Sequence, residues 1–256
     1  MTKQGFKNPV FVLKYINMRN IVFEPGIVCH VFNRGVDKRD IFISEADMWR
    51  FIQGMFLFND KDISLGILRQ IEIKNKGRIN FTLLKEFIDK NKTNREPLVR
   101  IMGDCLMPNH FHLMVQEIEK GGLSKFMHRL GTGYTNYFNK KYSRTGSLFE
   151  GPFKAAKIDN DEYLKYVLVY MNIINPGQLV EPELKEKGIE NIEKVLNFAE
   201  NYSFCTNPDY LGKRESIIID KGLLGKVFDN PKEYQKFAKD ILLSKKYSLA
   251  SNFFLE

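Results

Sequence analysis

Two histidines separated by one residue are the most chemically suggestive feature of the sequence. His110, Phe111 and His112 begin an apolar run that continues to Val115, and such a run after a turn is typical of a β-strand. Because successive side chains of a strand point to opposite faces, the two imidazoles share one face. Two neutral imidazoles can bind one divalent cation, although a complete site needs a third ligand from elsewhere in the chain. On spacing alone, such a pair is more often two unrelated surface or core histidines.

A predicted helix near residue 170 carries three tyrosines. Tyr166 and Tyr170 are four positions apart and so share a face of the helix, whereas Tyr163 lies one turn earlier. A tyrosine beside a metal-bound phosphate can act as a nucleophile, because its oxygen attacks phosphorus while the metal offsets the developing charge. Packing of the rings against a sheet is the alternative, and for Tyr163 it is the preferred interpretation.

Positive charge is concentrated just after the two histidines. The chain of 256 residues has a formal net charge of +8, and residues 120–157 contain eight Lys or Arg and one acidic residue, a local balance of 8 − 1 = +7. Aromatic residues are interleaved with these basic positions. Such a surface suits single-stranded nucleic acid, because basic side chains contact phosphates while rings stack on bases. Many of these rings are also expected in the core.

Cysteine usage and hydropathy exclude several classes of protein. The three cysteines are widely spaced and form no CxxC motif, which argues against a disulfide framework and against a zinc ribbon. No window approaches the ~18 apolar residues of a membrane span, and residues 1–20 lack the apolar core of a signal peptide. We therefore expect a cytoplasmic protein without membrane contact.

The hydrophobic pattern predicts the order strand, helix, strand, strand, helix, strand. This order is typical of a ferredoxin-like (split βαβ) α+β fold, an antiparallel sheet with helices on one face. The other face is expected to be open and to carry both histidines. The predicted strands cover residues 26–32, 98–106, 110–115 and 153–158, and the predicted helices cover residues 45–58, 123–138 and 162–175.

Two glycines interrupt the second predicted helix. Gly131 and Gly133 should each cost that helix about 1 kcal/mol relative to alanine. A close approach of the sheet or of a ligand to the helix backbone is the expected reason.

Two further segments lie outside the strand and helix order. Residues 60–97 are charged and helical in pattern, and are interpreted as an insertion into a main domain that covers residues 1–180. Residues 181–256 are interpreted as a helical extension packed on that domain. The helices predicted in the extension cover residues 182–200, 221–228 and 231–244.

Several ordered motifs resemble those of the IS200-like single-tyrosine (Y1) transposase family. The resemblance covers about residues 26–180 and is closest to the REP-associated (RAYT) branch. Residues 202–241 of this chain also resemble the C-terminal extension of that branch. The motifs are Val28–Gly35 (VCHVFNRG), Leu106–His112 (LMPNHFH), Leu123–Met127 (LSKFM), Arg144–Lys154 (RTGSLFEGPFK) and the helix stop at Asn175-Pro176.

The resemblance implies an HUH endonuclease that cleaves and rejoins hairpin-forming single-stranded DNA. It implies that His110 and His112 bind Mg²⁺ or Mn²⁺, and that Tyr170 attacks the scissile phosphate to give a 5′-phosphotyrosine and a free 3′-OH. Relatives act as monomers or homodimers, and such a protein would associate with the nucleoid. The basic residues expected to contact DNA are Arg34, Lys125, Arg129, Lys140, Lys141, Arg144 and Lys154.

One extra residue separates Tyr170 from Asn175, compared with the family pattern. Counted back from Asn175, the family tyrosine would fall on Met171, and the third metal ligand one turn later would fall on Ile174. One inserted residue in a helix is commonly absorbed as a π-bulge. We therefore predict a π-bulge here, with Asn175 as the third ligand and Asn172 as the alternative.

Two other functions fit part of the pattern. A hairpin DNA-binding protein that has lost catalysis would explain the shifted register after Tyr170. A phosphohydrolase of the histidine-triad kind would need a third alternate histidine, but position 114 is Met. Of the remaining histidines, His30 is expected in the core or at a sheet edge, and His128 in solvent or facing DNA.

Overall fold

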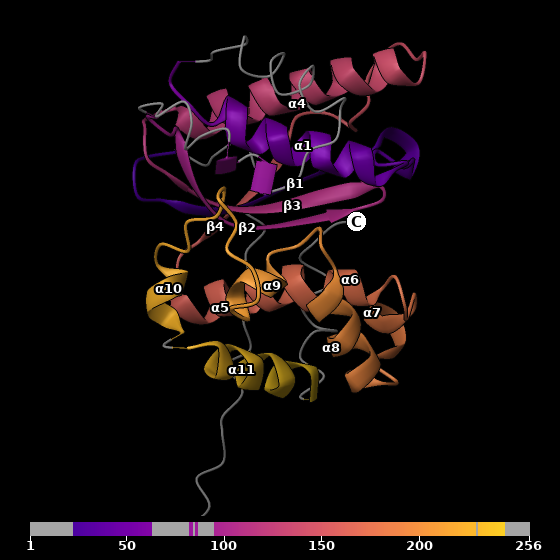
Figure 1. Cartoon of the computed structure of the whole chain (residues 1–256), viewed down its shortest axis with the longest axis vertical. Helices are drawn as coiled ribbons and strands as arrows, with labels where there is room; N and C mark the ends of the chain where they lie inside the picture. Colours follow the sequence, from indigo (N-terminus) through magenta and orange to yellow (C-terminus); the bar gives the residue numbers. More distant parts are fainter. Residues whose placement is uncertain (1–22, 63–81, 84, 87–94, 229, 244–256) are drawn as a thin grey trace, which may run out of the picture.

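The computed structural model describes residues 23–62, 82–83, 85–86, 95–228 and 230–243 (Figure 1). At its centre is a four-stranded antiparallel sheet in the order β2-β3-β1-β4. The third strand lies between the first and the second, which is the split βαβ order of a ferredoxin-like fold, so the predicted fold class is confirmed. The strands are β1 (Val28–Arg34), β2 (Val99–Met107), β3 (His110–Glu117) and β4 (Lys154–Ile158).

Two crossover helices cover one face of the sheet, as expected (Figure 1). They are α1 (Glu45–Phe58) and α4 (Gly122–Lys141), and both lie within a few residues of their predicted bounds. The β3 residues of this face, Phe111 and Leu113 among them, are buried in a core shared with both helices. Phe51 of α1 contacts Phe111 with ring centroids 4.8 Å apart.

The buried carboxylate of Asp47 fastens the start of α1 to the end of α4. Its Oδ2 accepts hydrogen bonds from the backbone amide of Ser44 at 2.9 Å and from the hydroxyl of Tyr142 at 2.7 Å. Lys141 Nζ lies 2.6 Å from Asp47 Oδ1. Burial raises the pKa of Asp47, but the hydrogen bonds from Lys141 and Tyr142 outweigh burial, so its pKa lies below the ordinary value. Asp47 is therefore ionised, and the groups hydrogen-bonded to it stabilise its negative charge.

The second face of the sheet is covered too, so the expectation of an open face was wrong. A continuous helical rod crosses this face, formed by α5 (Asp161–Val169), η3 (Tyr170–Ile174) and α6 (Asn175–Gly177) (Figure 1). Beneath it Met114 is 0% and His112 1% exposed. The physical reason is that this face also carries Val28 and Met107, which form a second apolar cluster with the rod.

The extension begins after the rod and consists of short helices. They are α7 (Leu184–Lys187), α8 (Ile192–Asn201), α9 (Asn207–Tyr210), α10 (Leu224–Val227) and α11 (Pro231–Leu243). The single helix predicted over residues 182–200 is divided, because Gly188 has a φ of 92° and ends α7. The short helix α9 was not predicted. Most of the predicted insertion over residues 60–97 lies outside the described residues.

The extension is hydrogen-bonded to the edge strand β2. Leu106 donates its backbone amide to Phe204 O at 2.8 Å, and Thr206 donates its amide to Asp104 O at 3.0 Å. An edge strand otherwise presents unpaired amides and carbonyls to any further strand. The extension therefore occupies part of an edge that would otherwise be open.

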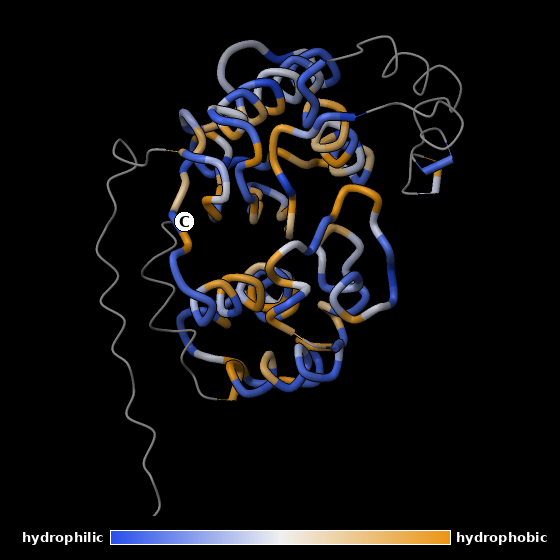
Figure 2. Tube along the Cα trace, turned by 90° about the vertical axis from the view of Figure 1, so that its left-hand side faces the viewer, coloured by the Kyte–Doolittle hydropathy of each residue, from blue (hydrophilic) through white to orange (hydrophobic). Residues whose placement is uncertain are grey.

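Hydrophobic segments face the inside of the layers, whereas the outer turns are hydrophilic (Figure 2). Within the described ranges, no helix is both long and apolar enough to cross a membrane.

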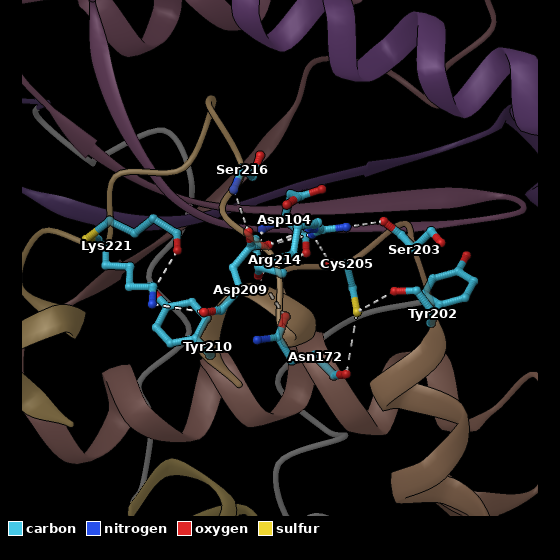
Figure 3. Close-up of polar contacts among 12 residues, drawn as sticks. Asp104, Asn172, Tyr202, Ser203, Cys205, Asp209, Tyr210, Arg214, Ser216 and Lys221 are labelled. Carbon is cyan, nitrogen blue, oxygen red and sulfur yellow. Dashed lines mark hydrogen bonds and ion pairs between the residues drawn. The ribbon is translucent and has the colours of Figure 1, made fainter. Parts of the chain in front are cut away.

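Asp104 is a buried carboxyl group on β2, beside an ion pair of the extension (Figure 3). Arg214 donates from Nε and Nη2 to Asp209 Oδ2, at 2.9 and 2.5 Å. Burial raises the pKa of Asp104 to about 7, and Asp209 adds to the rise while Arg214 opposes it. The guanidinium of Arg214 is hydrogen-bonded to Asp209. Its positive charge therefore offsets little of the negative charge that Asp104 would carry when ionised.

Asp104→Asn is expected to remove a pH dependence of stability. The native pKa of about 7 lies above the ordinary value of 3.8, so the folded state holds a proton that the unfolded chain releases. The unaltered protein should therefore lose stability as pH rises between these values, by on the order of 4 kcal/mol. Asp104→Asn should melt higher than the unaltered protein at pH 8, and the two should differ least at pH 4.

Thermal unfolding at pH 4 to 8 measures this effect, with the exposed Asp240→Asn as the matched control. A difference in Tm that is the same at every pH would show that Asp104 titrates normally in the folded state.

Candidate active site

His110 and His112 lie side by side on β3, with their rings edge to face and centroids 5.0 Å apart. Asn109 Oδ1 lies 2.6 Å from His110 Nδ1, so Nδ1 carries the proton and Nε2 keeps its lone pair. His112 is deeper, and its Nε2 has no hydrogen-bond partner among the described residues. Each ring can therefore present Nε2 to the same cation.

His30 on β1 lies against the ring of His112. Its Nε2 is 2.9 Å from His112 Nδ1, and the two rings stack with centroids 5.0 Å apart. Burial lowers the pKa of His30 to about 3, and burial with the nearby charges of His110, His30 and Lys185 lowers the pKa of His112. Both rings are therefore neutral at pH 7. A hydrogen bond to the second imidazole nitrogen fixes the ring and tautomer of a metal-binding histidine.

The helical rod contains a π turn at the predicted place. The turn spans Tyr170–Ile174, and the backbone amide of Asn175 donates to Tyr170 O, one residue further than in an α-helix. The extra residue is absorbed in this turn, which confirms the predicted π-bulge. Asn175 is the fifth residue after Tyr170. Because of the π turn it lies one turn after Tyr170, at the place that the fourth residue after Tyr170 would take in an α-helix.

Tyr170 packs against the histidine pair. Its ring lies edge to face with that of His112, with centroids 5.7 Å apart, and its side chain is almost fully buried. Lys185 Nζ, from α7, donates to Tyr170 Oη at 2.9 Å and lies 4.9 Å from the ring centroid. An ammonium group at this position can stabilise the negative charge that a phenol oxygen carries when it acts as a nucleophile.

Geometry separates the two candidates for a third metal ligand. Asn172 is fully engaged, because its Oδ1 accepts from Thr206 Oγ1 at 2.8 Å and its Nδ2 donates to Tyr234 Oη at 3.2 Å. Asn175 Oδ1 accepts from Gln178 Nε2 at 3.2 Å, but Asn175 Nδ2 is buried without a partner in the described part of the chain. Exchanging the two amide atoms by a half rotation would turn an oxygen toward that position.

The donor set predicted for the site is two imidazoles and one amide. No cluster of three His, Cys, Asp or Glu side chains able to hold a metal ion occurs among the described residues. His112 Nε2 and Asn175 Nδ2 are nevertheless buried polar atoms for which a bound ligand would provide a partner. Imidazole nitrogens suit Mn²⁺ better than Mg²⁺, which prefers oxygen ligands and retains its waters. The residues present therefore fit a divalent cation of this kind.

The basic residues predicted to contact DNA are not gathered around the histidines. Arg34 and Lys154 share the histidine face, since the strand register pairs Arg34 with His110 and Lys154 with Phe32. Arg34 is bound by Glu150 through two hydrogen bonds of 2.6 and 2.9 Å. The others lie on α4 or just after it, in the layer across the sheet from Tyr170: Lys125, Arg129, Lys140, Lys141 and Arg144.

Three of those side chains have partners within the protein. Lys141 compensates Asp47, as described above. Arg129 donates to the backbone oxygen of Asp60 at 2.6 Å, and Arg144 donates to Asn139 Oδ1 at 3.3 Å. Lys125 and Lys140 are exposed. A contact of these residues with DNA stays a prediction.

Residues 76–172 match the model of a protein family described as IS200-like transposase. The matched segment contains both histidines, the basic helix α4 and Tyr170. Over this segment the chain is similar to IS200-like transposases.

Two solved structures resemble the chain loosely. One is a REP-associated tyrosine transposase bound to a REP hairpin, with 9% identity, 79% of this chain and 92% of that chain covered, and a TM-score of 0.40. The other is tRNA(His) guanylyltransferase from Saccharomyces cerevisiae, with 12% identity, 75% and 80% covered, and a TM-score of 0.27. A comparison with curated proteins finds no match.

Two residues that contact the candidate site were not predicted to do so. His30 could have been found, because β1 neighbours β3 in a ferredoxin-like sheet and alternation places His30 on the face of His112. Lys185 could not have been found from sequence, because it follows Tyr170 by 15 positions and stands among several other lysines.

Asn172→Ala is expected to destabilise the protein by roughly 1–3 kcal/mol, because Thr206 and Tyr234 each lose a buried hydrogen-bond partner. Urea unfolding measures the change. The exposed Asn201→Ala, in α8, is the control and should shift stability by less than about 0.5 kcal/mol. Equal effects of the two substitutions would mean that Asn172 does not hold the extension on the rod.

Proposed function

We propose that the protein is a strand transferase that cleaves hairpin-forming single-stranded DNA through a covalent Tyr170 intermediate. The observation that carries this proposal is the contact of Tyr170 with His112, because it brings a nucleophile to a pair of imidazoles that can share a cation. The family match over residues 76–172 supports it. We further propose the REP-associated branch of that family and a main domain over residues 1–180.

Mg²⁺ or Mn²⁺ would be held by His110, His112 and Asn175. When bound, the cation would polarise the scissile phosphate and offset the charge that develops on its oxygens. His30 keeps the ring of His112 oriented through its Nδ1, which leaves Nε2 for the cation. Lys185 holds the oxygen of Tyr170 and supplies a positive charge beside it.

The proposed step is a transesterification. Tyr170 Oη bonds to phosphorus as the bond between phosphorus and the 3′ oxygen breaks. The electron pair of the broken bond goes to the 3′ oxygen, which takes up a proton, and the phenol proton passes to water. The products are a 5′-phosphotyrosine and a free 3′-OH, so a second 3′-OH can reverse the step and rejoin strands.

The DNA would approach at the end of the sheet where Arg34 faces His110, since His110 is only half-buried. Lys154 on the same face would contact a phosphate, and the basic residues on and after α4 would hold the duplex stem. As a DNA-processing enzyme the protein would work in the cytoplasm at the nucleoid, as a monomer or a homodimer.

One observation favours a second function, that of a catalytically inactive hairpin-binding protein. Tyr170 and His112 are each 1% exposed, so a phosphate reaches them only after neighbouring groups move. Such a protein would bind hairpin DNA without metal and without forming a covalent product. The adduct experiment below separates the two functions.

A covalent adduct is expected when the protein is incubated with Mn²⁺ and a hairpin oligodeoxynucleotide that has single-stranded flanks. A denaturing gel detects it as a band retarded by the attached strand. Tyr170→Phe should abolish the band, because phenylalanine has no nucleophilic oxygen. Tyr163→Phe, on the same helical rod, is the matched control and should retain it. Metal-independent binding with no adduct would instead support the inactive protein.

His112→Ala is expected to abolish cleavage while hairpin affinity stays within a few fold of the unaltered protein. The reason is that phosphate and base contacts fix the DNA at positions away from the histidine. Parallel gel-shift and cleavage assays measure both quantities. Equal loss of binding and cleavage would show that the histidine is needed for folding rather than for chemistry.

Lys185→Met is expected to lower the single-turnover rate of adduct formation about 10–100-fold at saturating DNA, with an unchanged Kd for the hairpin. Methionine keeps the length of the side chain but removes its charge and its hydrogen bond to Tyr170. Lys185→Arg should recover much of the rate because it restores a cationic donor. An equal loss of rate in Lys185→Met and Lys185→Arg would indicate that the packing of the side chain, rather than its charge, determines the rate.

A further inference from the structure

A cavity of about 470 Å³ opens between α4 and the segment that precedes β4, on the face of the sheet away from Tyr170. All but two of its lining residues belong to residues 127–153, within the basic segment identified from the sequence. One of the two exceptions is Phe111, the neighbour of His110 on β3. A single DNA strand passing the end of β3 can thus contact the cavity on one face of the sheet and the histidines on the other.

Gly131 lines this cavity and is not explained by packing within the described structure. A Cβ added at Gly131 would meet no atom within 4 Å, whereas a Cβ at Gly133 would lie 2.6 Å from the ring of Phe58. Gly133 is therefore required by the close approach of α1 to α4. Gly131 instead leaves open space above the helix backbone, at a position where alanine would favour the helix.

The chemistry of the lining fits a flat ring with a polar edge. Phe149 offers a half-buried ring that is held in place by Phe111 and Tyr134, with centroid distances of 5.8 and 6.4 Å. On α4, Thr135 and Asn136 add a hydroxyl and an amide to the same cavity. The lining contains no Lys or Arg, so it does not suit a phosphate group.

We propose that this cavity binds one unpaired nucleobase of the DNA strand that the active site cleaves. The base would stack on Phe149 and occupy the space above Gly131, while Thr135 and Asn136 bind its polar edge. Lys154, which follows the cavity residue Phe153 directly, would contact the adjoining phosphate. This inference rests on the proposed function, because it assigns a second contact to the same substrate.

The test compares a hairpin oligodeoxynucleotide that has single-stranded flanks with the same hairpin lacking them. In the flanked probe, 2-aminopurine replaces each flanking base in turn, because stacking quenches its fluorescence. At one position the unaltered protein should quench the probe on binding. Gly131→Leu fills the cavity and should abolish that quenching and weaken the flanked hairpin at least tenfold, while the affinity for the blunt hairpin changes less than twofold.

Ser124→Leu is the matched control, since it adds the same side chain at an exposed position of α4 outside the cavity. Asn136→Ala, also exposed, should weaken the flanked hairpin severalfold, and it decides the matter if Gly131→Leu does not fold. If Asn136→Ala and folded Gly131→Leu both bind the flanked hairpin and quench the probe as the unaltered protein does, this inference is overturned. The proposed function is not affected by that result. If the unaltered protein binds neither hairpin, both are overturned.

Discussion

The backbone hydrogen bond from Asn175 to Tyr170 is the constraint on which the proposed site depends. In an uninterrupted α-helix the residue one turn after Tyr170 would be Ile174, which offers no metal ligand. The π turn replaces it with a buried asparagine while Tyr170 stays against His112. A π turn is rare and is frequently found at functional sites. Here Asn172, within the turn, is held by Thr206 and Tyr234, so the extension supports the irregular geometry.

The extension consequently contributes to more than stability. It binds the edge of β2, it holds the π turn through Asn172, and it places Lys185 at the oxygen of Tyr170. The site is thus assembled from separate parts of the chain. The strands β1 and β3 supply the histidines, the rod supplies the tyrosine, and α7 supplies the ammonium group. The same arrangement leaves Tyr170 and His112 buried, so the proposed DNA substrate would reach them only after neighbouring groups move.

The sheet was predictable from local pattern, because alternation placed His110 and His112 on one face. The π turn was predictable from the resemblance, because one surplus residue before Asn175 relative to the family pattern implied a bulge. The covered second face was not predicted, although it carries apolar residues such as Met114 and Met107, which form a cluster that needs burial. Lys185 was not predictable, since its contact with Tyr170 depends on how the chain turns after α6 and not on spacing along a helix.

The most direct test of the central claim is the mass of the peptide that carries the DNA after the covalent complex with a hairpin oligodeoxynucleotide has been digested with nuclease and protease. The account predicts a 5′-phosphonucleotide on the peptide that contains Tyr170, with fragment ions that place it on that residue. A nucleotide on any other residue, or no modified peptide from a protein that binds the hairpin, would contradict it.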